Sequence, residues 1–229
     1  MIEMIHGDCM DYMRKWQDQA FDLAIVDPPY GIKADGNKQS TGGHGGRKAH
    51  DIKDWDRERP PALYFKELFR VSKNQIIWGA NYYPENLFPS MGWIVWDKGQ
   101  RINQSDGELA FSSFEKALRI ITMNRVELLI EGTIHPTQKP VALYKWLLSR
   151  YAKPGDKILD THGGSGSICI ACHDLGFDLT WIEKDADHYA AACKRYKDHA
   201  SQAVLFEPEE LRKEPYNNLL QLTGQEPGN

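Results

Sequence analysis

The sequence predicts an α/β fold with a doubly wound, mostly parallel sheet that carries one antiparallel hairpin strand. Short apolar runs alternate with helical patterns near both ends of the chain, and such alternation is typical of parallel sheets. The run at residues 23–26 stops at Pro28-Pro29. Because proline cannot donate to a sheet ladder, the chain must leave the sheet there. A glycine turn at residues 163–166 separates a later strand pattern from a helical one.

The composition is that of an ordinary globular chain. Its 229 residues, 41% hydrophobic and 26% charged, allow one sizeable core. We expect a single domain over residues 1–206 and an acidic tail over residues 207–229. No apolar run is long enough to span a bilayer, and no basic-then-apolar leader opens the chain. These features predict a cytoplasmic protein without a membrane partner.

Charge and cysteine content exclude two further classes. The net charge of −4 argues against a uniformly basic coat for nucleic acid. One C-x-x-C occurs, but no second cysteine pair or suitably spaced histidine pair completes a zinc site. We therefore expect buried free thiols and no metal. The four cysteines are Cys9, Cys169, Cys172 and Cys193.

The first elements lead to an acid at a strand end. A strand pattern over residues 1–6 is followed by Asp8, which suits the N-cap of a helix. The apolar run at residues 23–26 is typical of a buried central strand. Asp27 then stands at its carboxyl end, where open α/β sheets bind ligands. A strand-ending turn with a capping Asp explains the same residues equally well.

A long segment without apolar periodicity follows at residues 31–59. It contains six glycines and a local excess of positive charge. A connection of this length is usually functional or disordered. We interpret it as a loop that meets phosphates, with a flexible surface loop lacking any partner as the alternative. Its candidate phosphate contacts are Lys33, Lys38, Arg47 and Lys48.

The middle of the chain continues the pattern. A helix begins after Pro60-Pro61, and strands are expected at residues 74–78 and 92–96. Residues 109–114 and 116–123 are expected to form a hairpin or two neighbouring strands. An amphipathic helix over residues 141–151 follows.

The last third predicts a nucleotide site. A strand at residues 157–161, a glycine turn, a helix at residues 168–175 and a strand at residues 177–183 end at Glu183. A helix over residues 185–200 comes next. Glycines let the backbone approach a ligand, and an acid about twenty residues later can accept from ribose hydroxyls. A purely structural turn with a surface Glu is the alternative.

The type of nucleotide follows from what the turn lacks. It has no Lys-[Ser/Thr] pair and does not spell G-x-G-x-x-G, so it suits neither a triphosphate nor a dinucleotide well. Asp160, just upstream, can attract a cationic group. S-adenosylmethionine, a nucleoside with ammonium and sulfonium groups and no phosphate, fits this combination.

Three motifs, in this order, resemble the signatures of DNA amino-methyltransferases, which methylate N6 of adenine or N4 of cytosine. They are DPPY at residues 27–30, HPTQKP at residues 135–140 and DTHGGSGS at residues 160–167. The order, catalytic motif first, is similar to the circularly permuted β group. The resemblance covers roughly residues 1–200 and implies the S-adenosylmethionine-dependent methyltransferase fold. It also implies that the N-terminal strand lies next to the strand at residues 177–183.

The resemblance assigns a role to each motif. The first would hold and stack a flipped target base through Asp27, Pro28, Pro29 and Tyr30. Around the cofactor, Glu183 would take the ribose hydroxyls, Asp8 the adenine amine, and the segment 137–139 the methionine end. The full set implied for the cofactor is Asp8, Cys9, Thr137, Gln138, Lys139, Asp160, His162, Gly163, Gly164, Ser165, Gly166, Ser167 and Glu183.

Two departures from the family pattern matter. Thr161-His162 replaces the usual Pro-Phe, and Ser167 stands where Thr is common. Only residues 123–134 separate the expected hairpin from the HPTQKP motif, where the family commonly carries a target-recognition segment. Recognition of the target DNA sequence must then come from the 31–59 loop, from residues 99–108 or from a partner subunit.

The resemblance therefore implies an adenine-N6 DNA methyltransferase that uses S-adenosylmethionine and acts on DNA, double-stranded and by base flipping. Asp at the first motif position resembles the adenine enzymes, whereas cytosine-N4 enzymes more often carry Ser. Cytosine-N4 transfer, an RNA or nucleotide substrate, and a non-catalytic nucleic-acid-binding subunit are the alternatives. A homodimer is compatible with the sequence, which says nothing of a restriction partner.

Overall fold

The computed structural model describes residues 1–32, 56, 58–99, 105–124 and 138–201. Eight strands form one sheet in these residues. The strands are β1 (Ile2–His6), β2 (Phe21–Val26), β3 (Ser72–Trp78), β4 (Ile94–Asp97), β5 (Gly107–Ser112), β6 (Arg119–Thr122), β7 (Lys157–Asp160) and β8 (Asp178–Glu183). The helices are α1 (Cys9–Met13), α2 (Ala62–Val71), α4 (Val141–Tyr151), α5 (Ser167–Leu175) and α6 (Ala186–Ala200).

The strand order is β1-β8-β7-β2-β3-β5-β4-β6. Strand β5 is antiparallel to both of its neighbours, β3 and β4, and the other described pairs are parallel. The expected mostly parallel sheet with one reversed strand is therefore confirmed. The hairpin partner was wrong: β5 and β6 do not pair, because β4 lies between them and β6 pairs with β4 in parallel.

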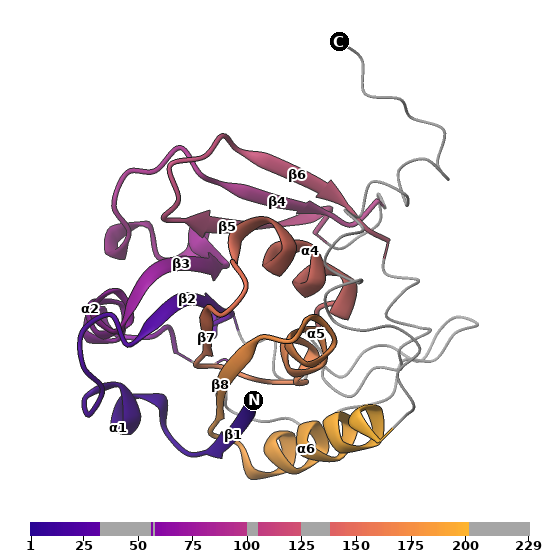
Figure 1. Cartoon of the computed structure of the whole chain (residues 1–229). Helices are drawn as coiled ribbons and strands as arrows, with labels where there is room; N and C mark the ends of the chain where they lie inside the picture. Colours follow the sequence, from indigo (N-terminus) through magenta and orange to yellow (C-terminus); the bar gives the residue numbers. More distant parts are fainter. Residues whose placement is uncertain (33–55, 57, 100–104, 125–137, 202–229) are drawn as a thin grey trace, which may run out of the picture.

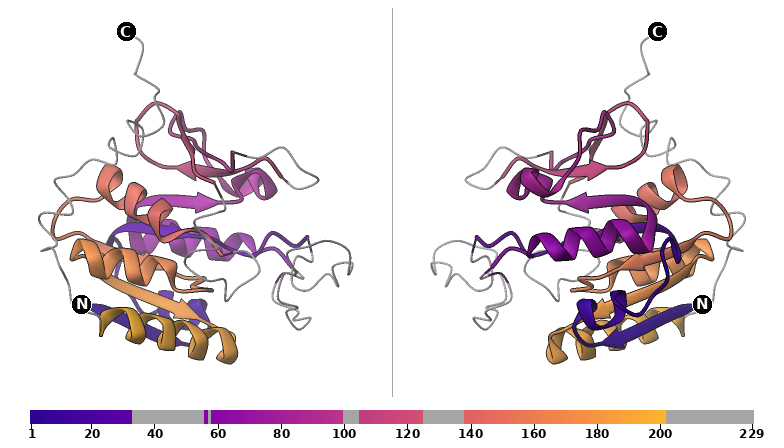
Figure 2. Two further views of the ribbon diagram at one scale, coloured as in Figure 1. Left: turned by 90° about the vertical axis from the view of Figure 1, so that its right-hand side faces the viewer. Right: turned by 90° about the vertical axis from the view of Figure 1, so that its left-hand side faces the viewer.

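Helices cover both faces of the sheet. In Figure 1 the short α1 and the longer α2 lie on the left of the sheet, and α4, α5 and α6 lie on the right. Figure 2 shows the strands one above another, from the indigo β1 at the bottom to the strands β4 and β6 at the top. Alternate residues of the central strand serve the two cores: Leu23 and Ile25 face α4 and α5, whereas Ala24 and Val26 face α2.

Strand β2 is central because its residues suit burial on both sides. From Leu23 to Val26 each side chain is at most 1% exposed, as expected for a parallel strand covered by helices on both faces. It lies between β7 and β3. Its carboxyl end therefore points to the same edge of the sheet as the ends of β7 and β8, and we call this the carboxyl edge.

The first and the last strand of the described chain are neighbours in the sheet. Strand β1 pairs in parallel with β8, with His6 opposite Glu183. This confirms the place expected for the N-terminal strand. The reversed direction of β5 has a second consequence, since it brings the first residues of β5 to the carboxyl edge.

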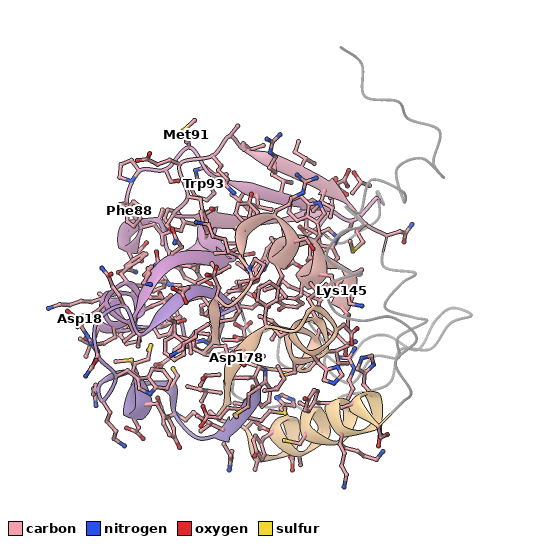
Figure 3. The ribbon with its side chains drawn as sticks, viewed as in Figure 1. Asp18, Phe88, Met91, Trp93, Lys145 and Asp178 are labelled. Carbon is pink, nitrogen blue, oxygen red and sulfur yellow. The ribbon has the colours of Figure 1, made fainter. Side chains whose placement is uncertain are left out.

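The loop between β3 and β4 carries the aromatic and apolar residues Phe88, Met91 and Trp93 on one side of the molecule (Figure 3). Phe88 and Trp93 pack against Phe111 of β5, with ring centroids 5.0 and 6.0 Å away. Phe69 of α2 also contacts Phe111, at 6.3 Å, so the loop and the helix cover this part of the sheet together. In the described part of the chain, no helix combines the length and the apolar character that a membrane crossing requires.

Candidate active site

Asp27 directly follows the carboxyl end of β2, and both of its carboxylate oxygens accept hydrogen bonds. Oδ1 accepts a hydrogen bond of 2.6 Å from the hydroxyl of Tyr30. Oδ2 accepts one from the ammonium group of Lys139, whose side chain is only 2% exposed. The prolines at positions 28 and 29 turn the chain out of the sheet, which leaves the Asp27 side chain in the space where the neighbouring strands end.

The other two predicted groups of this motif also have partners. The carbonyl of Pro28 lies 3.2 Å from the hydroxyl of Tyr83, which also donates to the carbonyl of Trp78 at 2.9 Å. The ring of Tyr30 stacks on that of Tyr82, with centroids 4.8 Å apart and an interplanar angle of 12°. An added Cβ on Gly79 would lie 2.1 Å from this ring. Tyr30 is therefore held flat between the backbone and Tyr82.

Lys139 lies between two carboxylates. Besides Asp27, its ammonium group is 3.1 Å from Oε2 of Glu108, the second residue of β5. The other oxygen of Glu108 pairs with Lys98 at 2.8 Å. The ring of Trp78 lies beneath the Lys139 ammonium at 5.2 Å, within the range of a cation–π contact.

Opposite charges and burial set the pKa values in this cluster. Burial raises the pKa of Asp27 against the opposing effect of Lys139. Burial alone would raise the pKa of Glu108, but the ammonium groups of Lys139 and Lys98 lower it to about 2. Burial lowers the pKa of Lys139, yet the two carboxylates outweigh it and raise the value above its usual range. Lys139 and Glu108 thus stay charged near neutral pH.

The glycine turn joins β7 to α5 at the same edge. Gly164 and Gly166 adopt φ values of +53° and +69°, which L residues with side chains rarely adopt. An added Cβ on Gly163 would lie 1.8 Å from the ring of Trp181 on β8. The close approach required at Gly163 is thus explained by packing, while the conformation of the other two glycines sets the path of the turn.

Glu183 is fixed at the carboxyl end of β8. Its Oε2 accepts from the backbone N–H of Gly164 at 2.8 Å, and its Oε1 from that of Asp185 at 2.7 Å. Each carboxylate oxygen has a second lone pair, so both can still accept from a ligand. The acid is consequently held beside the glycine turn, as the sequence predicted.

The two serines of the turn have structural partners. The guanidinium of Arg195 on α6 donates to the carbonyl of Ser165 at 3.0 Å and to the hydroxyl of Ser167 at 2.9 Å. The two hydroxyls are 3.1 Å apart. Both serines are buried, and they connect the start of α5 to α6.

Asp160, the last residue of β7, is 2% exposed. Its Oδ1 accepts from the backbone N–H of His162 at 3.0 Å. Burial raises its pKa to about 8, despite that hydrogen bond, and the charges of Asp27 and Glu183 act in the same direction. Both acids therefore act on Asp160, and a cationic neighbour would stabilise the charged form of its carboxyl group.

His162 stands where the family usually has an aromatic residue. Its ring lies edge-on to Tyr64 of α2 at 5.0 Å, and its Nδ1 is 3.0 Å from Thr161 Oγ1. The same Thr161 hydroxyl is 2.7 Å from the hydroxyl of Tyr64. Burial lowers the pKa of His162 to about 4, so its imidazole is neutral at physiological pH and replaces one planar ring by another.

Asp8 and Cys9 follow β1 at the far side of this edge. Asp8 caps α1 by accepting from the N–H of Met10 at 2.9 Å and pairs with Lys184 at 2.9 Å. The expected N-cap is confirmed. Burial raises the pKa of Cys9 to about 12, so its thiol is inert. Cys169 and Cys172 are also buried and free, while Cys193 is half-buried and free.

The carboxyl edge thus brings together most of the predicted site residues. Gln138 and Lys139 are buried beside it at 5% and 3% exposure. The expected residues Thr137, Lys33, Lys38, Arg47 and Lys48 lie outside the described residues, as do the 207–229 tail and most of the 31–59 loop. Four contributors were missed by sequence reasoning, because only the register of β3, β4 and β5 brings them here: Tyr82, Tyr83, Lys98 and Glu108.

Comparisons with known proteins agree with this geometry. Residues 95–194 match the DNA methylase family of N6 and N4 enzymes. The Type II methyltransferase M.HinfI of Haemophilus influenzae is 24% identical over 85% of this chain and 68% of its own length.

Two solved structures show the same fold. The crystal structure of the M1.HpyAVI–SAM complex has a TM-score of 0.58 at 22% identity and covers 85% of this chain and 100% of its own. The PvuII cytosine-N4-specific DNA methyltransferase has a TM-score of 0.58 at 12% identity and covers 96% of this chain and 93% of its own. The fold is that of S-adenosylmethionine-dependent DNA methyltransferases.

The family match over residues 95–194 and the relatives make the chain similar to DNA amino-methyltransferases of the N6/N4 family, and the described parts of its three motifs lie at one edge of such a sheet.

Proposed function

We propose that this enzyme transfers a methyl group from S-adenosylmethionine to the exocyclic N6 of an adenine flipped out of DNA. The observation that carries the proposal is the position of Asp27 and the Pro28 carbonyl at the end of β2, beside the glycine turn and Glu183. Two acceptors facing one amine can draw its nitrogen toward a tetrahedral form, so that its lone pair becomes available.

The residues present fit the cofactor. Asp160 is a buried carboxyl whose pKa is raised to about 8 because burial outweighs the His162 hydrogen bond and the charge of Lys139, and a cationic ligand group would lower that pKa. Glu183 retains free lone pairs beside Gly164 for hydroxyl donors. When bound, S-adenosylmethionine supplies an electrophilic methyl group on sulfonium. The chain's own part is to bind, to orient the amine and to exclude water.

The target base must leave the duplex, because no exocyclic amine inside a base stack can reach Asp27. Tyr30 is the candidate stacking surface, and in the described structure Tyr82 covers one of its faces at 4.8 Å. An entering base would take the place of Tyr82 and keep the same type of contact. The basic loop at residues 33–48 is proposed to contact phosphates of double-stranded DNA.

The choice of adenine rests on Asp27, because the first residue of this motif is more often Ser in cytosine-N4 enzymes. The likeness to the PvuII cytosine-N4-specific enzyme makes cytosine N4 the second candidate. We also assign the chain to the permuted β group, on the motif order and on the pairing of β1 with β8. The cytoplasmic location stays a prediction.

Nucleoside analysis tests the proposal directly. The protein is incubated with labelled S-adenosylmethionine and mixed-sequence DNA, and the digested nucleosides are separated. N6-methyladenine is expected; N4-methylcytosine would establish the second candidate, and no labelled nucleoside would contradict both.

Asp27→Ala provides the matched variant for this assay. It should abolish transfer and leave cofactor affinity within about twofold of the wild type, because Asp27 contacts the base and not the cofactor. Loss of methyl transfer together with loss of cofactor binding would contradict the role given to Asp27.

A further inference from the structure

The cluster around Lys139 contains an acid that the motifs do not include. Glu108 is the second residue of the antiparallel strand β5, and its register places it opposite Trp96 of β4. Because β5 runs against its neighbours, its start lies beside the carboxyl ends of β3 and β4. Glu108 is thereby brought within 3.1 Å of the ammonium group that also holds Asp27.

The contacts of Asp27 in the described structure conflict with its proposed role as an acceptor for the target amine. Its Oδ1 is taken by Tyr30 and its Oδ2 by Lys139. An incoming amine needs one of these oxygens as an acceptor. The amine nitrogen also gains positive charge as it takes the methyl group, so an ammonium kept in hydrogen-bond contact with the same oxygen would oppose the transition state.

Glu108 offers this ammonium a second position. Its Oε2 is buried and accepts no well-directed hydrogen bond from the described residues, although it is an ion-pair neighbour of Lys139 at 3.1 Å. Its Oε1 is held by Lys98. The Trp78 ring beneath the ammonium can stay in contact with it during a small movement.

We propose that Glu108 is a positioning residue for methyl transfer, which receives the Lys139 ammonium when the target amine takes its place on Asp27 Oδ2. The inference rests on the proposed function. Glu108 touches neither base nor cofactor and acts through Lys139. In the resting enzyme Lys139 occupies the amine's position, and in the working enzyme the Lys139–Glu108 pair keeps the charge neutralised nearby.

Charge states near neutral pH agree with this movement. Glu108 is ionised, with its pKa lowered to about 2, and Lys139 keeps its proton because both carboxylates raise its pKa. The titratable groups that interact in and around this cluster are Asp27, Glu108, Lys98, Tyr30, Tyr83, Asp160 and Tyr144.

The test compares Glu108→Gln with the wild type in kcat, in KM for DNA and across a pH series. Glu108→Gln keeps the shape and removes the charge, so Lys139 should stay on Asp27. We expect kcat to fall about 10- to 100-fold with KM for DNA nearly unchanged, as for a misplaced catalytic group. Raising the pH should restore part of the loss, because Lys139 loses its proton more easily without Glu108.

Two further variants separate positioning from structure. Glu108→Asp keeps the anion and should retain more activity than Glu108→Gln. Glu115→Gln removes an exposed carboxyl just beyond β5 and should behave as the wild type. Wild-type rates in Glu108→Gln would overturn the inference. So would a loss that is equal at every pH and equal in Glu108→Asp, because that pattern marks a structural role.

A readout without transfer keeps the two proposals distinguishable. In protein labelled with ¹⁵N-lysine, the Nζ signal of Lys139 is assigned by its disappearance in Lys139→Arg. Adding mixed-sequence DNA with S-adenosylhomocysteine should shift this signal in the wild type and not in Glu108→Gln. If the wild type transfers no methyl group yet shows this difference, the proposed function fails and the movement stands. An unchanged signal in the wild type overturns the movement.

Discussion

Replacing Asp160 by Asn should make the fold less sensitive to alkaline pH. Asp160 is 2% exposed, and burial raises its pKa to about 8. The unfolded value is about 3.9. Because the folded protein keeps a proton that the unfolded chain releases, the stability linked to this group is fully present below about pH 4 and is lost as the pH rises toward about 8.

The size of the effect follows from the two pKa values. Between them the free energy of unfolding falls by about 1.4 kcal/mol per pH unit. From about pH 5 to about pH 8 the wild type should therefore lose about 3 to 4 kcal/mol through Asp160 alone. Asn keeps the oxygen that accepts from the His162 N–H but has no proton to lose, so Asp160→Asn should lack this decline.

Urea unfolding of the cofactor-free protein at a series of pH values measures the difference. Subtracting the two curves removes the contribution of every other titrating group that the substitution leaves unchanged. Asp11→Asn, at an exposed position on α1, serves as the control and should follow the wild type. Parallel curves for the wild type and Asp160→Asn would refute the argument that burial of the Asp160 carboxyl outweighs its compensating contacts.

Two further predictions concern packing. Gly163→Ala should destabilise the protein by about 1–3 kcal/mol or more, since its Cβ would lie 1.8 Å from Trp181 in a filled core. Gly155→Ala, with φ +90° and open space around it, should cost only backbone strain of about 1–2 kcal/mol, and equal losses of melting temperature would contradict the packing argument. A thiol reagent should modify the half-buried Cys193 before the three buried cysteines in the native protein; mass analysis showing simultaneous modification would contradict that burial.

The sequence was sufficient where local chemistry decides structure. Proline cannot pair in a sheet, so the end of β2 and the position of Asp27 followed from two residues. The glycine turn and Glu183 followed from a strand–turn–helix–strand order of the same kind. The cap at Asp8 needed only a short polar side chain before an apolar helical pattern, and its contact with Met10 confirms it.

Pairings between distant strands could not be read in this way. The apolar runs that became β5 and β6 were recognised, but an apolar run does not specify its neighbour, and β4 lies between them. The same limit hid Glu108 and Lys98, because their contacts depend on the register of β4 and β5. Lys139 was assigned to the methionine end of the cofactor by its motif, whereas in the structure it contacts Asp27.

The position of β1 has a consequence for the order in which the protein folds. Its described neighbour in the sheet is β8, and the contact of Met1 with Asp178 spans 177 residues. Closing so long a loop is slow compared with forming local structure. Strand β1 can therefore dock only once β8 is available, so His6 and Glu183 come to lie opposite each other late in folding. The part of the carboxyl edge that β1 and β8 form together is therefore completed late in folding.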